Sequence, residues 1–324
     1  MKLRTLVAAS AALLLAPAYS APVVYTGAGT DAAAITAVRD LFRVEVGGGT
    51  VAGANGSFGG VRREINWDGV PDAFAAPNNL PLNFFNVNSP RGAVFSTPGT
   101  GVAVSANAGV APIEFDNINP TYSQIFQTFS AQRLFAAISS NVVDVNFFAA
   151  GTTDAGSTSA FASIFTDVDL LGPTAIEYFD GGISLGLFTV PVFNNGLSFL
   201  GVRFNAGERV TRVRITSGNA ALGPNDGGSV DVVAMDDFLY AEPRRVVPEP
   251  SSLALVSLGL LGCLARCRSR RSGVGSKRQA KVDGSTASLS GRTAGPRHSC
   301  HGVDVVSHLS GRHASRDRYK IDIY

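Results

Sequence analysis

The chain has 324 residues, and its central part, residues 21–247, contains no cysteine, histidine or lysine. This composition excludes disulfide frameworks, Ser-His-Asp and Cys-His catalysis, and the usual zinc sites from that part. With twelve arginines and twenty acidic residues it has a net charge of −8. Such a charge argues against a nucleic-acid partner, whose binding depends on phosphate contacts. The remaining chemistry is that of carboxylates, arginines and hydroxyls.

The first twenty residues have the layout of a secretory signal peptide. A positively charged start is followed by the apolar stretch 6–16. Ala18 and Ser20 then place small residues three and one positions before the expected cleavage site. We therefore expect residues 1–20 to direct export and residues 21–243 to form the exported domain.

One short helix is expected near the start of that domain. Ile35, Val38 and Phe42 recur at helical spacing, and Asp31 stands where an N-cap is favoured. The run 47–60 is too rich in glycine for regular structure, so it is expected to be a surface loop.

The rest of the domain alternates between β-rich stretches and clusters of Gly, Asn and Pro, the pattern of an all-β sandwich. The stretches are 92–99, 102–109, 141–151, 159–170, 175–182, 184–193, 197–207, 209–218 and 230–240. In 209–218, Val213 and Ile215 lie on one face and Arg212 and Arg214 on the other. We expect phenylalanines to fill the core. The alternative is a two-domain β protein divided near residues 151–159.

Three features follow one another after this domain. The motif Pro248-Glu249-Pro250 comes first, then the apolar segment 251–265, and then an arginine cluster. The cluster consists of Arg266, Arg268, Arg270 and Arg271. As a helix, the apolar segment is about 22 Å long against a hydrocarbon core of about 30 Å. The arginines favour the cytoplasmic side of the membrane.

This order of motif, apolar helix and arginine cluster, over residues 244–271, resembles the PEP-CTERM sorting tail of Gram-negative bacteria. In that family, exosortase reads the tail, and it is regarded as a cysteine-dependent protease or transpeptidase of the membrane. The resemblance implies an exosortase-type partner and an inner-membrane anchor formed by a single short transmembrane helix. After processing, the protein is expected at the cell surface or outside the cell, where such species export polysaccharide.

The chain continues beyond the arginines, which is unusual for the family. Residues 272–324 are rich in Ser, Gly and Arg and show no apolar periodicity, so we expect a disordered extension. We interpret His298, Cys300 and His301 in this extension as a chance cluster rather than as a metal site.

The domain also resembles an exported domain that recurs in bacterial proteins with such tails and has no established activity. The stretches that carry this resemblance are GGVRREINWDGVPD, NFFNVNSPRGAVFSTPG and SFLGVRFNAGERVTRVRITSG, with VVAMDDFLYAEP at the end. The last stretch looks like the final strand of jelly-roll sandwiches related to lectins and carbohydrate-binding modules. The expected fold is therefore an all-β, jelly-roll-like sandwich of two sheets.

Two groups of residues are candidate sites. Trp67, flanked by Glu64 and Asp68, is a candidate for stacking on a sugar ring, with the two carboxylates hydrogen-bonding its hydroxyls. The alternative is that Trp67 is a core residue beside an Asp-Gly turn. The second group consists of aspartates at strand ends, whose oxygens suit calcium. These are Asp167, Asp169, Asp231, Asp236 and Asp237. The alternative is that they cap turns or lie solvated at the surface.

We expect a structural or adhesive role rather than an enzymatic one. The alternative is a carbohydrate-binding module, or a glycoside hydrolase that uses two carboxylates on extracellular polysaccharide. No cofactor other than calcium is expected.

Overall fold

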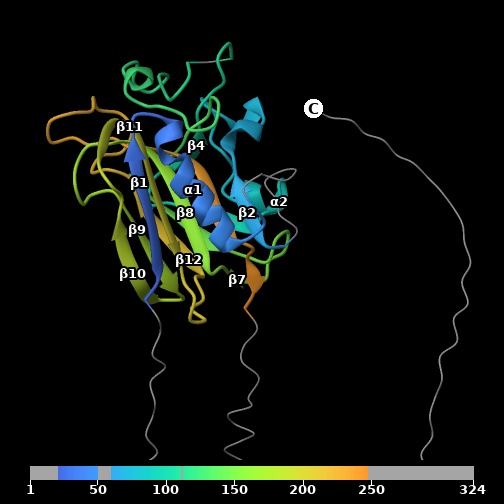
Figure 1. Cartoon of the computed structure of the whole chain (residues 1–324). Coiled ribbons are helices and arrows are strands. Elements are labelled where there is room, and N and C mark those ends of the chain that lie inside the picture. Colours follow the sequence, from blue (N-terminus) through green and yellow to red (C-terminus); the bar gives the residue numbers. More distant parts are fainter. Residues whose placement is uncertain (1–20, 50–59, 111, 247–324) are drawn as a thin grey trace, which may run out of the picture. The chain divides into compact units, whose positions relative to one another are not determined.

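Two antiparallel β-sheets, packed face to face, form the body of the protein (Figure 1). The computed structural model describes residues 21–49, 60–110 and 112–246, all of which belong to one compact unit. The expected signal peptide, most of the glycine-rich run, the sorting tail from residue 247 and the extension lie outside the described residues.

The larger sheet has the order β1-β11-β8-β13-β5-β4, and β2 pairs with β13 beside this path. Its strands are β1 (Val23–Gly29), β11 (Phe193–Arg203), β8 (Ala160–Val168), β13 (Ala234–Ala241), β5 (Phe135–Ile138), β4 (Gly101–Val104) and β2 (Arg62–Ile65). The smaller sheet has the order β10-β9-β12-β6-β3. Its strands are β10 (Ile183–Thr189), β9 (Ala175–Asp180), β12 (Arg212–Thr216), β6 (Val142–Phe147) and β3 (Ala93–Ser96).

Short elements complete the domain. A two-stranded ribbon joins β7 (Gly156–Ser157) to β14 (Arg244–Arg245). The helices are α1 (Ala32–Val46) and α2 (Phe84–Val87), with single 3₁₀ turns η2 (Trp67–Gly69), η3 (Asp72–Phe74) and η4 (Tyr122–Gln124).

The main core lies between the two sheets and is rich in phenylalanine, as the composition predicts. Strand β12 shows how the pattern builds it, because Val213 and Ile215 are fully buried in this core while Arg214 is exposed. The predicted alternation in this strand is confirmed.

The larger sheet is covered on both faces. Phe161 and Phe165 of β8 point into the core between the sheets, whereas Ala162 and Ile164 pack in a second cluster with Phe42 of α1. The helix lies across the outer face of this sheet (Figure 1). A strand buried on both faces has no reason to alternate polar and apolar residues, and every residue of β8 is buried.

Small residues of the sheet allow α1 to approach closely. A β-carbon on Gly201 of β11 would lie 2.8 Å from Cδ2 of Phe42 and 3.0 Å from the β-carbon of Ala162. The helix begins as predicted, because the Asp31 carboxylate accepts a hydrogen bond from the backbone N–H of Ala34 at 3.1 Å. It extends to Val46, beyond the predicted apolar repeat.

Each of the nine predicted β-rich stretches overlaps a strand. Strands from before and after residues 151–159 are neighbours in both sheets, so the described chain forms one sandwich and not two domains. Regular pairing continues past the expected boundary at residue 243, because Arg244 and Arg245 pair with Ser157 and Gly156 in the separate two-stranded ribbon.

In the described ranges, no helix is both long enough and apolar enough to cross a membrane. The apolar segment 251–265, expected to be the transmembrane helix, lies outside them.

Candidate functional site

Three aspartates meet where β8 ends. Asp167 and Asp169 come from the end of β8, and Asp226 comes from the loop that joins β12 to β13. Each offers one carboxylate oxygen, and these oxygens all lie within 4.8 Å of one another. Of the described residues, these three form the one group of acidic side chains with metal-binding geometry.

A bulge between β8 and β11 shapes this end of the sheet. Phe193 pairs with Val168 and Leu197 with Thr166, so three residues of β11 stand opposite the single residue Asp167. Within the bulge, the backbone N–H of Asn195 donates to Oδ1 of Asp167 at 2.7 Å. Asp167 has a φ of +65° and Asn195 a φ of +50°, values that non-glycine residues rarely adopt.

Asp231, in the loop just before β13, supports the cluster. Its carboxylate is fully buried and accepts hydrogen bonds from the backbone N–H groups of Asp169 at 3.1 Å and of Leu170 at 3.3 Å. Its own N–H donates to Oδ1 of Asn219 at 2.9 Å. Both oxygens of Asp231 are therefore used to hold the backbone beside Asp169.

The loop that carries Asp226 is also anchored. Oδ1 of Asp226 accepts from the backbone N–H of Val232 at 2.7 Å. The hydroxyl of Tyr122 accepts from Gly223 N–H at 2.7 Å and donates to the carbonyl of Pro224 at 2.9 Å. These bonds place Asp226 opposite the end of β8 in a fixed position.

The electrostatics of the cluster are unfavourable for ionised carboxylates. Burial, together with the nearby charges of Asp226, Asp169 and Asp231 and against the hydrogen bond from Asn195, raises the pKa of Asp167 to about 7. Burial, followed by the charge of Asp226, raises the pKa of Asp169 to about 6. The arrangement favours a positive charge between these side chains.

The structure divides the aspartates predicted for calcium into two sets. The strands beside these aspartates, β8 and β13, pair with each other, with Ala234 opposite Thr166. Because the pairing is antiparallel, Asp231 lies near Asp169, whereas Asp236 lies farther along the strand, away from the bulge.

Asp236 and Asp237 belong to a separate buried network. Asp236 accepts from the backbone N–H of Phe129 at 2.6 Å, and the Ser130 hydroxyl donates to Asp236 at 3.2 Å and to Asp237 at 3.1 Å. Burial, together with the charges of Glu64 and Asp68 and against the hydrogen bonds with Asp236 and Ser130, raises the pKa of Asp237 to about 6.

Trp67 is a core residue, which corrects its interpretation as a sugar-stacking platform. Its ring is fully buried, stacks on Phe135 with centroids 4.2 Å apart, and meets Phe238 edge-on at 5.0 Å. The indole N–H donates to the carbonyl of Asp236 at 2.9 Å. Neither ring face is open to a ligand.

The acids beside Trp67 hold the fold together. Glu64 is buried and forms a two-pronged ion pair with Arg43 of α1, with N–O distances of 2.9 and 2.6 Å, and a further ion pair with Arg62 at 2.8 Å. Asp68 accepts from the backbone N–H of Arg133 at 3.0 Å. These contacts tie the helix and a long loop to the larger sheet.

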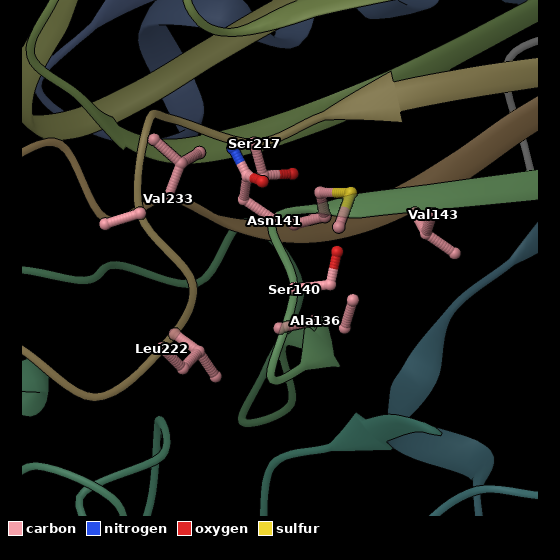
Figure 2. A pocket seen from close by; sticks show the side chains of 10 residues that line it. Ala136, Ser140, Asn141, Val143, Ser217, Leu222 and Val233 are labelled. Atoms are coloured by element: carbon pink, nitrogen blue, oxygen red, sulfur yellow. The ribbon is translucent and has the colours of Figure 1, made fainter. Parts of the chain in front are cut away.

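A small enclosed cavity lies beside the loop that carries Asp226 (Figure 2). Its volume is about 10 Å³, and Asn141, Ser217 and Leu222 are among the side chains around it. This is about the space that one water molecule needs, so the cavity is too small for a substrate.

Sequence reasoning missed Asp226. It lies 57 residues after Asp169 in a Gly, Pro and Asn-rich loop, GPNDGG, that reads as an ordinary turn. The signal available was an aspartate in a loop adjacent to a predicted strand, which is too common to identify a ligand.

The tail gives a match to a known family. Residues 246–271 match the family described as the PEP-CTERM protein-sorting motif. The chain carries a PEP-CTERM sorting motif. The matched residues contain the predicted motif Pro248-Glu249-Pro250 and the arginine cluster, and the motif implies sorting by exosortase, with membrane anchoring followed by export. No curated protein and no solved structure matches the chain significantly.

Proposed function

We propose that the protein is a structural or adhesive component of the cell surface or extracellular matrix, delivered by exosortase processing of its PEP-CTERM tail. The observation that carries this proposal is the continuity between fold and tail. The N–H of Val246 donates to the carbonyl of Ala155 at 2.9 Å, which is the last backbone hydrogen bond among the described residues, and the sorting motif begins at the same residue. All described strands of the two sheets lie before the motif, so processing within the tail leaves them intact.

The strand order supports assigning the sandwich to the jelly-roll architecture. Strands β5, β13, β8 and β11 are neighbours in one sheet, and β6, β12, β9 and β10 are neighbours in the other. Along the chain these eight strands cross between the sheets in the order of a jelly roll. This fold carries many unrelated functions, so the role is argued from the surface and the sites.

Two observations favour a non-enzymatic role. Every described aromatic side chain is buried or half-buried, so the described surface offers no exposed ring for stacking on a sugar. A glycoside hydrolase also needs a free pair of carboxyl groups across a cleft. The buried pair Asp236 and Asp237 is instead occupied by the backbone N–H of Phe129 and the hydroxyl of Ser130.

Carbohydrate binding is the second candidate, and a groove favours it. This groove has a volume of about 590 Å³, a size typical of ligand sites. Its wall combines the apolar side chains of Ile183 and Phe204 with the ion pair between Arg209 and Asp180 at 3.4 Å. Binding on a glycan array that is lost in Arg209→Ala and Asp180→Ala would establish this function, and no binding would favour the structural role.

Replacement of the sorting motif tests the proposal. We expect Pro248→Ala, Glu249→Ala and Pro250→Ala together to leave the full-length chain in the membrane, because exosortase no longer recognises the tail. A matched control removes the same residue types from exposed positions of the domain, Pro98→Ala with Glu45→Ala. The control is expected to be processed normally. Release of the motif variant at the rate of the natural chain would contradict the proposal.

A further inference from the structure

The oxygens of the three aspartates at the end of β8 have the spacing of ligands around one cation. Calcium holds its oxygen ligands at about 2.3–2.6 Å, so two oxygens on the same ion are at most about 5 Å apart. The carboxylate oxygens of Asp167, Asp169 and Asp226 lie within 4.8 Å of one another. Each of the three can therefore contact one calcium ion without movement of the backbone.

One of these carboxylates is buried with an oxygen that has no partner. Asp167 is 1 % exposed, and its Oδ2 accepts no hydrogen bond. Its other oxygen, Oδ1, accepts the N–H of Asn195. An isolated ionised carboxylate is costly to bury, and folded proteins normally pair such a group with a cation. Elsewhere in the sandwich arginines do so, as Arg43 does for Glu64 and Arg214 for Asp144.

Hydrogen bonds from outside the cluster hold the three carboxylates together in spite of their repulsion. Asn195 fixes Asp167, Val232 fixes Asp226, and Asp231 fixes the backbone of Asp169. Each bond involves a backbone N–H, so the positions depend on the fold and not on mobile side chains. Such a preformed frame is typical of the groups that orient metal ligands.

We propose that Asp167, Asp169 and Asp226 bind a calcium ion that fastens the loop between β12 and β13 to the end of β8. The ligand set consists of hard carboxylate oxygens, which suit calcium and not the softer transition metals. Extracellular calcium modules typically bind with dissociation constants of about 10⁻⁴–10⁻³ M. Binding in this range fills the site only where calcium is millimolar, so the ion stabilises the sandwich after export.

The proposal is independent of how the tail is processed. Calcium binding can be measured on the full chain in detergent micelles, whether or not exosortase acts on it. Failure of the calcium site would leave the sorting proposal untouched, and failure of sorting would leave the calcium site untouched.

Isothermal titration calorimetry with calcium chloride, together with thermal unfolding in calcium and in chelator, tests the site. The natural chain is expected to bind one calcium ion and to unfold several degrees higher in millimolar calcium. Asp167→Asn and Asp226→Asn remove a charge at nearly constant shape and are expected to weaken binding at least tenfold. In chelator both variants are expected to unfold at or above the temperature of the natural chain, because the repulsion is relieved.

Asp180→Asn is the matched control, since Asp180 lies at the end of β9 in an ion pair with Arg209 and outside the cluster. It is expected to keep the full calcium response. The absence of binding by the natural chain at 10 mM calcium would overturn the proposal. An unchanged calcium response in both Asp167→Asn and Asp226→Asn would overturn it as well, and equal affinity for magnesium would overturn the assignment of calcium.

Discussion

Truncation of Trp67 is expected to be among the most damaging changes to the domain. The ring is fully buried, stacks on Phe135 and touches Phe238, so Trp67→Ala removes a large apolar group and leaves a cavity. Replacements of buried Trp by Ala typically cost about 3–5 kcal/mol. The carbonyl of Asp236 also loses its indole N–H partner, and an unpaired buried group costs a further ~1–3 kcal/mol.

The expected loss is therefore at least about 4 kcal/mol. For a domain of about 225 residues, one kcal/mol corresponds to roughly 2–4 °C in the unfolding midpoint. We expect Trp67→Ala to unfold at least about 8 °C lower than the natural chain, as measured by circular dichroism. Trp67→Phe keeps part of the stacking and loses the hydrogen bond, so its midpoint is expected to lie between the two.

Leu187→Ala serves as the control, because Leu187 is 60 % exposed on the edge strand β10. Its loss is expected to change the free energy of unfolding by less than about 0.5 kcal/mol. The chain contains a single tryptophan, so its fluorescence reports the same core in the natural protein. A midpoint for Trp67→Ala within 2 °C of the natural chain would refute the reasoning. It would place the ring outside the core, where a ligand could reach it.

Two further predictions concern the packing of α1 and the buried acids. Gly201→Ala is expected to lower stability by about 1–3 kcal/mol in thermal unfolding, because the new methyl group meets Phe42, and Phe42→Leu in the same chain is expected to recover part of this loss. Since the pKa of Asp237 is raised to about 6 in the folded state, the folded chain holds a proton that the unfolded chain releases. Its stability in calcium-free buffer is therefore expected to fall as the pH rises from about 4 to about 6, and Asp237→Asn is expected to flatten that slope. Equal slopes in both proteins would show that Asp237 does not titrate in this range.

Local patterns predicted the parts of the fold that are visible over a few residues. Asp31 and the apolar repeat of α1 predicted the helix, and the spacing of Val213 and Ile215 predicted which face of β12 is buried. The sorting tail was predictable for the same reason, because its motif, apolar segment and arginines follow one another directly in the sequence.

Strands β5 and β1 of the larger sheet were missed. In β5 the segment Phe135–Ile138 is buried from Phe135 to Ala137, so it has no alternation to detect. The β1 sequence VVYTGAG contains Gly27 and Gly29 where α1 approaches the strand closely. A β-carbon would meet side chains of the helix at 2.7 Å on Gly27 and at 2.2 Å on Gly29. For β5 the explanation lies in partners that are distant in the sequence, and for β1 it lies in the helix that follows the strand.

The candidate site depends on such distant partners most of all. Sequence reasoning named Asp167, Asp169 and Asp231 among the candidate calcium ligands, and the structure brings these three together. It could not separate Asp236 from this set, because the register between β8 and β13 decides which aspartate reaches the bulge. Nor could it find Asp226, whose position depends on how its loop folds back.

Mass spectrometry of the mature protein recovered from outside the cell tests the central claim most directly. The account predicts an N-terminus at Ala21 and a C-terminus within the tail, beyond Val246 and before Arg266, because the described strands of both sheets lie before the matched sorting motif. A released protein that still contains Arg266 to Arg271 would contradict exosortase processing and, with it, the proposed route to the cell surface.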